Sequence, residues 1–338
     1  MPDKMRGAAA PESKRDSPES NPKLKPALKA AVFFLALLGF CAWPLPLDAG
    51  PLSGRTVVLD PGHGSNSFEG ARMLVLGNFI RDELESRGAS VLMTRPERAN
   101  TPLALRPLLT NKWALESLRD QLLRRFLHAP AGPEERAGLK AQLISLKGSL
   151  DLLGRAVENL EGYAHILLNH PFDPTVAATP DQRRILGLQD SDYLRHNWLF
   201  ISLHANFGAS ESWMGVCIFY SSNDVRLPYF SDYTHSEYSR RFAQILLGPI
   251  SRSGLGTRTG VNRSSFMVIR ETNIPAVLVE NGHYTNHANL ALLRDNDFMR
   301  RLAAIYADAI VRHFAEVDAG RFSGLAIDGG GEAAGQQS

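Results

Sequence analysis

The chain has 338 residues, 44% of them hydrophobic, which is enough to bury one substantial core with an insertion. Its formal net charge at pH 7 is only +2, and residues 51–318 contain no basic run interleaved with aromatic residues. A nucleic-acid partner is therefore not expected. The economical organisation is one folded domain over residues 51–318, between an N-terminal extension and a flexible Gly- and Ala-rich tail at residues 319–338.

The N-terminal extension has two parts. Residues 1–29 carry seven basic and four acidic side chains and are rich in Pro and Ser, so we expect them to be disordered. Residues 30–47 then form an 18-residue run without a charge. Its apolar core has the length of a signal-peptide core, and the whole run just reaches the length of a transmembrane helix. We therefore predict export to the periplasm or cell envelope, with residues 30–47 either cleaved or kept as an inner-membrane anchor.

The first strand and helix of the folded domain present two polar side chains. Residues 56–59 are apolar or β-branched and are followed by a Pro-Gly pair, which predicts a short core strand and a turn that carries His63. A helical apolar pattern begins near Glu69 and ends at an Arg-Gly pair at residues 87–88. Glu69 is thus expected in the first turn of this helix.

A helical hairpin is predicted within residues 112–194. Two apolar stripes indicate its arms, and a segment rich in Pro and Ala at residues 129–133 separates them. The longer arm, residues 139–167, would extend about 43 Å at ~1.5 Å per residue. The hairpin either packs on its own domain or serves as a docking or autoinhibitory element for a regulatory partner. The stripes comprise Leu108, Leu115, Leu118, Leu122 and Phe126, and then Leu139, Leu143, Leu146, Leu150, Leu153, Val157, Leu160, Ala164 and Leu167.

Two later strands also end in polar side chains. Residues 199–202 form a strand-like run that is followed by His204, and residues 276–279 form another that delivers Glu280. Ligands of open α/β sheets bind at the carboxyl ends of the strands. We therefore expect these two side chains to lie at one sheet edge with the histidine and glutamate of the first strand and helix.

The remaining elements complete the predicted fold class. Strands are expected at residues 90–94 and 216–220, and helices at residues 232–247 and 289–314. Strands that alternate with helices predict an α/β fold. We expect a central, mostly parallel twisted sheet flanked by helices, with the helical hairpin inserted into it.

The four polar side chains suggest a chemistry. Two imidazoles and one carboxylate, with a fourth position left for water, form a ligand set typical of hydrolytic zinc. Glu280 is then free to act as a base and later deliver the proton to a leaving amine, which implies amide hydrolysis. Each residue also has a simpler interpretation: a histidine in a turn is commonly solvated or capping, and Glu69 is favoured at a helix N-terminus by the macrodipole. The combination of all four favours the metal site.

Three motifs resemble those of a known family. The sequences VVLDPGHG at 57–64, FISLHAN at 200–206 and PAVLVENGHYTN at 275–286 occur in the order of three signatures of the zinc-dependent N-acetylmuramoyl-L-alanine amidases of the type 3 amidase family. The resemblance extends over about residues 55–110 and 195–315. These enzymes cut the amide bond between N-acetylmuramic acid and L-alanine in peptidoglycan. The resemblance therefore implies a peptidoglycan substrate and a role in cell-wall remodelling or cell separation.

The resemblance also implies roles for the four residues. His63, Glu69 and His204 would bind Zn²⁺, and Glu280 would be the catalytic glutamate. The distance from Glu69 to the Arg-Gly pair before the second strand matches the family and supports Glu69 over Glu83 or Glu85.

Several positions depart from the family or stay open. The loop between the first two ligand positions is shorter than usual, and Gly70 stands where a lysine commonly follows the ligand glutamate. His283 replaces an aromatic residue and is either a packing histidine or an extra imidazole near the carboxylate. Arg270 resembles a family arginine that would meet a substrate carboxylate. Asn206 and Asn281 are either hydrogen-bonding residues at the rim or turn formers. The hairpin is the largest departure, because the family lacks it at this position.

The sequence thus predicts an exported zinc amidase acting on peptidoglycan. One alternative is a catalytically silent envelope scaffold that binds peptidoglycan and recruits a partner through the helical hairpin. A second is a zinc peptidase that cuts another amide in the same wall with the same residues.

Overall fold

The computed structural model describes residues 50–64, 66–128, 132–163, 191–208, 210–221 and 236–321. The predicted disordered segment 1–29, the signal peptide or anchor 30–47 and nearly all of the tail 319–338 lie outside these residues. Among the helices within them, none combines the length and the apolar character needed to cross a membrane.

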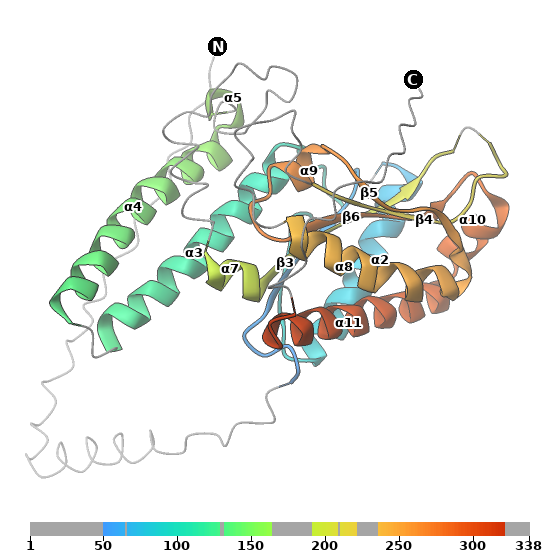
Figure 1. Ribbon diagram of the computed structural model, residues 1–338. Coiled ribbons are helices and arrows are strands. Elements are labelled where there is room, and N and C mark those ends of the chain that lie inside the picture. The colour runs from blue at the N-terminus through green and yellow to red at the C-terminus, as the bar shows by residue number, and fades with distance from the viewer. Residues whose placement is uncertain are drawn as a thin grey trace, which may run out of the picture. The chain divides into compact units, whose positions relative to one another are not determined.

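The core of the fold is a six-stranded sheet in the order β2-β1-β3-β6-β4-β5. Figure 1 labels β3, β4, β5 and β6 of this sheet. All neighbouring strands are parallel except β4 and β6, which run antiparallel. This confirms the predicted α/β class with a mostly parallel sheet flanked by helices. The strands are β1 (Thr56–Pro61), β2 (Ser90–Met93), β3 (Trp198–Asn206), β4 (Val216–Tyr220), β5 (Thr257–Arg263) and β6 (Ala276–His283).

Helices cover both faces of the sheet. One face packs against α2 (Phe68–Ser86), α8 (Ser236–Ile250) and α11 (Asn296–Asp318), whose buried side chains share one apolar cluster with Leu59, Ile201 and Val279 of the strands. The other face carries Val58, Phe200 and Leu278, which belong to a second cluster. Successive strand side chains alternate between faces, so Asp60, His204 and Glu280 project on the side of the second cluster. The shorter elements are α5 (Leu160–Tyr163), α7 (Asp192–Asn197), η3 (Ser251–Leu255), α9 (Met267–Arg270) and α10 (His287–Arg294).

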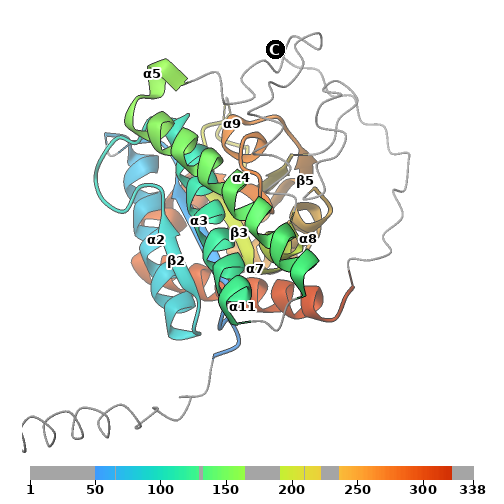
Figure 2. The same cartoon turned by 90° about the vertical axis from the view of Figure 1, so that its left-hand side faces the viewer.

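The predicted helical hairpin covers the second face. Its arms, α3 (Leu105–His128) and α4 (Pro133–Glu158), lie side by side (Figure 2). Their predicted apolar stripes bury Leu115, Leu122 and Leu146 in the same cluster as the strand residues of that face. The hairpin is therefore part of the domain core, which agrees with the expectation that it packs on its own domain.

The hairpin boundaries differ from the prediction. The first arm begins at Leu105, three residues before the first predicted stripe residue, Leu108, and so before residue 112, where the predicted insertion begins. The second arm ends at Glu158 and does not continue to residue 167, because Asn159 leaves the helical conformation with φ −137° and ψ 80°. The predicted stripe positions Ala164 and Leu167 lie outside the described residues.

Two positions on α4 test how much the hairpin contributes to stability. Leu146 is fully buried, whereas Ile144 is 64% exposed on the same helix. We expect Leu146→Ala to lower the free energy of unfolding by about 2–5 kcal/mol, since it removes buried methyl groups and leaves a cavity. Ile144→Ala should change it by less than about 0.5 kcal/mol. Urea denaturation followed by circular dichroism measures both, and equal effects would contradict the packing described here.

The C-terminal part contains a helix break that the pattern did not predict. One helix was expected over residues 289–314, but α10 ends at Arg294 and α11 begins at Asn296. Asp295 separates them and caps α11, since its side chain accepts a hydrogen bond from the Asp297 backbone N–H. The apolar residues of both helices keep helical spacing across the break, so the periodicity of the sequence did not indicate it.

Candidate metal and catalytic site

The sheet register brings His204 and Glu280 together. They are direct partners on the neighbouring parallel strands β3 and β6. Both strands extend beyond their predicted ends at residues 202 and 279, so the two side chains lie within strands and not in the following turns. Parallel partners project from the same face of a sheet, which places the imidazole beside the carboxylate.

Glu69 joins this pair from the first turn of α2. Ser67 caps the helix by accepting a hydrogen bond from the Gly70 backbone N–H at 2.9 Å. The Glu69 carboxylate lies between the two imidazoles: Oε2 is 3.2 Å from His63 Nε2, and Oε1 is 2.9 Å from His204 Nδ1. The Ala205 backbone N–H also donates to Oε1 at 3.1 Å. The helix start thus aims this carboxylate at both histidines.

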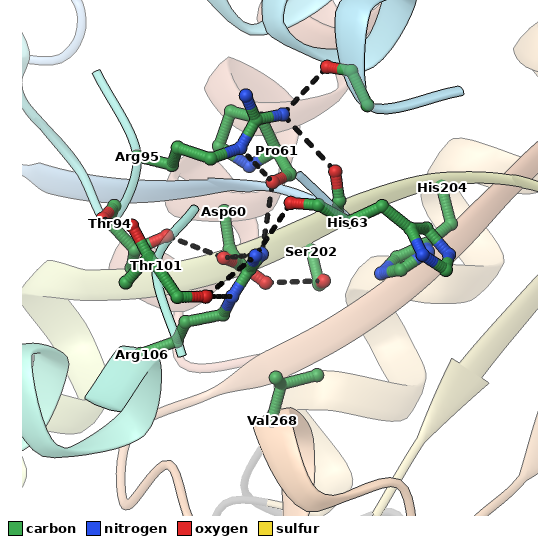
Figure 3. A network of polar contacts seen from close by, with 12 residues as sticks. Asp60, Pro61, His63, Thr94, Arg95, Thr101, Arg106, Ser202, His204 and Val268 are labelled. Carbon is green, nitrogen blue, oxygen red and sulfur yellow. Dashed lines mark hydrogen bonds and ion pairs between the residues drawn. The ribbon is translucent and has the colours of Figure 1, made fainter. Parts of the chain in front are cut away.

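His63, Glu69 and His204 offer ligand atoms that all lie within 4.8 Å of one another. Figure 3 shows the two imidazoles next to each other, with ring centroids 5.0 Å apart. Ligand atoms about 2.0–2.2 Å from a tetrahedral zinc ion are roughly 3.3 Å apart, close to the distances found here. The donor set and its spacing therefore fit a zinc ion.

Burial and charge perturb the titration of the two neighbouring strand residues. Burial disfavours a charged His204, but the hydrogen bond to Glu69 and the charge of Glu280 raise its pKa overall. Desolvation raises the pKa of Glu280 to about 7, with His204 opposing the shift and Glu69 adding to it. The Oε2 atom of Glu280 is buried without a hydrogen-bond partner among the described residues. A carboxylate in this state is suited to exchange a proton near neutral pH.

This shift predicts a pH-dependent stability difference for metal-free Glu280→Gln. Below the ordinary pKa of 4.5 the carboxyl is protonated in both the folded and unfolded states, so it costs nothing. Between 4.5 and about 7 the folded state retains a proton that the unfolded state has lost, so wild-type stability falls relative to the variant as pH rises. Above this window the variant should be more stable by on the order of 3 kcal/mol. Thermal unfolding in chelator from pH 4 to 8 measures the difference, and parallel curves would contradict it.

The loop from Gly62 to Glu69, here called the metal loop for its proposed role, leaves no room for a side chain at residue 70. A Cβ atom at Gly70 would lie 1.9 Å from the Gly64 carbonyl oxygen, and one at Gly62 would lie 2.4 Å from the His204 ring. His63 itself adopts a positive φ of 54°, which is uncommon for a residue other than glycine. The short loop and the absence of a side chain at residue 70 are therefore two aspects of one close packing.

Two glycine substitutions separate this packing from ordinary helix propensity. We expect Gly70→Ala to reduce both stability and metal occupancy, because its Cβ would displace the Gly64 backbone. Gly148 lies on an exposed part of α4, where a Cβ would meet no atom within 4 Å. Gly148→Ala should instead raise stability by about 0.5–1 kcal/mol. Metal content and thermal unfolding of both variants check this, and normal metal binding by Gly70→Ala would show that the loop tolerates the shift.

The predicted substrate contacts fall in different places. Asn281 is fully buried, and its amide donates to the His204 carbonyl and accepts from Tyr306 of α11. It follows Glu280 by one residue in β6 and so points to the opposite face of the sheet. Asn206 is half-buried at the end of β3. Arg270 is 5% exposed, and it bonds to Glu271 and to the Ser265 carbonyl, both at 2.8 Å.

His283 behaves as a packing residue. It is 1% exposed, and its ring meets Trp213 edge-on with centroids 6.4 Å apart. Burial and the nearby positive charge of Arg258 lower its pKa, which disfavours the charged imidazole.

Aromatic residues that were not among the predicted site residues border the site. Phe207 is 67% exposed, and its ring lies 5.4 Å from that of Tyr284, which in turn lies 6.2 Å from that of Phe68. Burial and then the charges of Glu69 and Glu280 raise the pKa of Tyr284. Each of these aromatic residues lies within four residues of a predicted site residue in the sequence. This closeness could have identified them as neighbours of the site.

A buried ionic network behind His63 was also missed. Asp60 is fully buried and forms an ion pair with Arg106 at 2.8 Å, while Ser202 donates a hydrogen bond to its other oxygen at 2.7 Å (Figure 3). Arg95 is fully buried beside them. An acid at the end of a core strand was a signal that a partner is required. Arg95 follows β2, and Arg106 lies in the first turn of the predicted hairpin arm α3, but the sequence pattern did not indicate that either would meet Asp60 or the His63 segment.

Comparison with known proteins gives one family match and distant relatives. Residues 175–312 match the family model Amidase_3, described as N-acetylmuramoyl-L-alanine amidase. A Staphylococcus epidermidis protein described as "Probable cell wall amidase LytH" is 24% identical over 269 residues, which are 80% of this chain and 62% of that protein. The N-acetylmuramoyl-L-alanine amidase CwlM of Bacillus licheniformis is 24% identical over 177 residues, which are 52% of this chain and 61% of that protein.

A solved structure of an N-acetylmuramoyl-L-alanine amidase from Clostridium difficile 630 is similar at 16% identity and a TM-score of 0.46, with 78% of this chain and 97% of that chain covered. The family match contains His204 and Glu280 but neither His63 nor Glu69, which the fold brings to the same place. This chain is thus similar in sequence to N-acetylmuramoyl-L-alanine amidases through the half that carries His204 and Glu280.

Proposed function

We propose that this protein is a zinc-dependent N-acetylmuramoyl-L-alanine amidase of the type 3 family that acts on peptidoglycan outside the cytoplasm. One observation carries the proposal: a buried carboxylate with a pKa of about 7, Glu280, lies in register with His204 beside a cluster of three metal-ligand side chains. The family match over residues 175–312 supports the choice of amide bond. The proposed reaction is hydrolysis of the bond between N-acetylmuramic acid and L-alanine, for cell-wall remodelling or cell separation.

The proposed mechanism assigns each side chain a task. His63, Glu69 and His204 would hold the zinc ion, and zinc supplies a Lewis acid that polarises a carbonyl and makes water more acidic. The hydrogen bond that Ser67 accepts from the Gly70 N–H fixes the start of α2, and the one that the Ala205 N–H donates fixes the direction of the Glu69 carboxylate. Glu280 would accept a proton from the attacking water and deliver it to the departing amide nitrogen, and a pKa near 7 allows both steps.

Substrate contacts are proposed for the side chains that border this site. Phe207 is exposed and contacts the half-buried Tyr284, whose pKa is raised by burial and by the charges of Glu69 and Glu280, and Asn206 lies at the end of β3. Arg270 would meet a substrate carboxylate only with a change in its bonds to Glu271 and Ser265, since it is almost wholly buried. The exposed Leu127 and Ile144 of the hairpin are the proposed contacts of a regulatory partner, and residues 30–47 are the proposed export signal or inner-membrane anchor.

Metal analysis and hydrolysis assays on the full chain test this function. We expect about one zinc per chain, release of dye from labelled sacculi, and fragments whose masses show glycan freed from intact stem peptides beginning with L-alanine. Fragments cut elsewhere in the peptide would identify a zinc peptidase. Absence of both metal and hydrolysis would support the catalytically silent scaffold, which the short loop and Gly70 make the second candidate.

A further inference from the structure

We infer that Arg95 and Arg106 are positioning residues that hold the metal loop in place through its carbonyl groups. This inference rests on the proposed metal-binding role of His63, and it deepens it by identifying what fixes that ligand. Both guanidinium groups lie on the side of the loop away from the imidazole ring and converge on the loop backbone (Figure 3).

The two arginines contact three consecutive carbonyls where the loop begins, those of Pro61, Gly62 and His63, and one carbonyl of α2. Arg106 donates to the Pro61 carbonyl at 3.0 Å and to the His63 carbonyl at 2.7 Å. Arg95 donates to Pro61 and Gly62 at 3.1 Å each, and to Gly70 of α2 at 2.6 Å. Hydrogen bonds from a charged donor are stronger than neutral ones, and a planar guanidinium fixes several acceptors at once. The arginines therefore connect the His63 segment to the helix that carries Glu69.

Both arginines are buried, so their guanidinium groups depend on protein acceptors and not on water. Arg95 is fully buried and Arg106 is 4% exposed. Asp60 is the carboxylate paired with Arg106, so much of the two positive charges is balanced by carbonyl dipoles of the loop. Burial and the neighbouring Arg106 lower the pKa of Arg95, with Asp60 opposing the shift. At the surface, water would solvate the guanidinium groups, whereas here the loop carbonyls take that role.

The backbone of His63 shows what the contacts achieve. Its φ of 54° is unfavourable for a residue other than glycine, and such a conformation persists only where surrounding groups hold it. The carbonyl of this residue is the one that Arg106 binds. Arg106 is also the second residue of α3, the first arm of the hairpin. A displacement of the first turn of α3 would therefore move the backbone of the proposed ligand.

Conservative substitutions in the full chain test the inference. Arg106→Lys keeps the charge opposite Asp60, but its donors sit on one nitrogen and cannot span the acceptors that the two terminal nitrogens of Arg106 reach. We expect its zinc dissociation constant, measured by competition with a chromophoric chelator, to rise roughly 10–100-fold, the usual effect of removing a group that orients a ligand. Amide hydrogen exchange of metal-free protein should become faster in residues 61–70, with little change elsewhere and a similar unfolding midpoint. Arg95→Lys should do the same through Gly62 and Gly70.

Arg241→Lys is the matched control, since Arg241 pairs with the buried Glu316 at 2.7 Å on the other face of the sheet. It should leave zinc affinity and loop exchange unchanged. Unchanged affinity and exchange in folded Arg106→Lys would overturn the inference while leaving the proposed function intact. If Arg106→Lys fails to fold, Arg95→Lys decides in the same way. If the wild-type protein binds no zinc, the proposed function fails, and loop exchange in the variants still decides whether the arginines hold the loop.

Discussion

Glu280→Gln is expected to retain zinc but to lose roughly 10²–10⁴-fold in hydrolysis of labelled sacculi, the range for removal of a general acid or base. The carboxylate lies beside the three proposed ligands but is not one of them, so the amide should leave the metal in place. Gln has nearly the same shape and cannot accept the proton. Metal content and dye release on the same preparation measure the two effects separately.

Glu211→Gln serves as the control for this variant. The side chain of Glu211 is 77% exposed to solvent. Its backbone carbonyl accepts a hydrogen bond from the Asn286 side chain. This substitution should leave both metal content and hydrolysis unchanged. Hydrolysis retained by Glu280→Gln would remove the glutamate from the mechanism, and loss of metal in that variant would make it a ligand.

Asp60→Ala is expected to have the largest effect on stability. The Asp60 carboxylate balances the charge of Arg106 and accepts hydrogen bonds from Thr94 and Ser202, and it is fully buried. Removing it leaves the buried Arg106 guanidinium without its carboxylate partner, and breaking a buried ion pair costs about 3–5 kcal/mol in comparable cases. Denaturant unfolding of the metal-free protein at pH 7 measures this loss without any contribution from metal binding.

The matched control removes an aspartate from an exposed ion pair. Asp318 pairs with Arg55 at 2.5 Å, and its side chain is 61% exposed. Asp318→Ala should cost no more than about 1 kcal/mol, because solvent screens surface ion pairs. A small effect of Asp60→Ala, close to that of Asp318→Ala, would show that Arg106 finds other partners.

Elements with a strong apolar pattern were predictable from the sequence. Strands β1, β3 and β6 were expected because continuous runs of apolar residues suit parallel strands buried on both faces. Strand β5 was not expected, since its sequence TRTGVNR is mostly polar and its first three residues are exposed. Such an edge strand is held by its pairing with β4, which a local pattern cannot show.

The residues of the site were likewise predictable only in part. The class of fold and the two hairpin arms were predictable from the sequence, because apolar periodicity and turn residues act locally along the chain, and the same strand ends nominated the four residues of the proposed site. Only the tertiary structure decided that Asn281 faces away from Glu280 and that Asp60 meets Arg106. It likewise decided that two buried arginines hold the carbonyls of the metal loop. Those facts depend on contacts between residues far apart in the chain, which form only when the sheet and hairpin pack together.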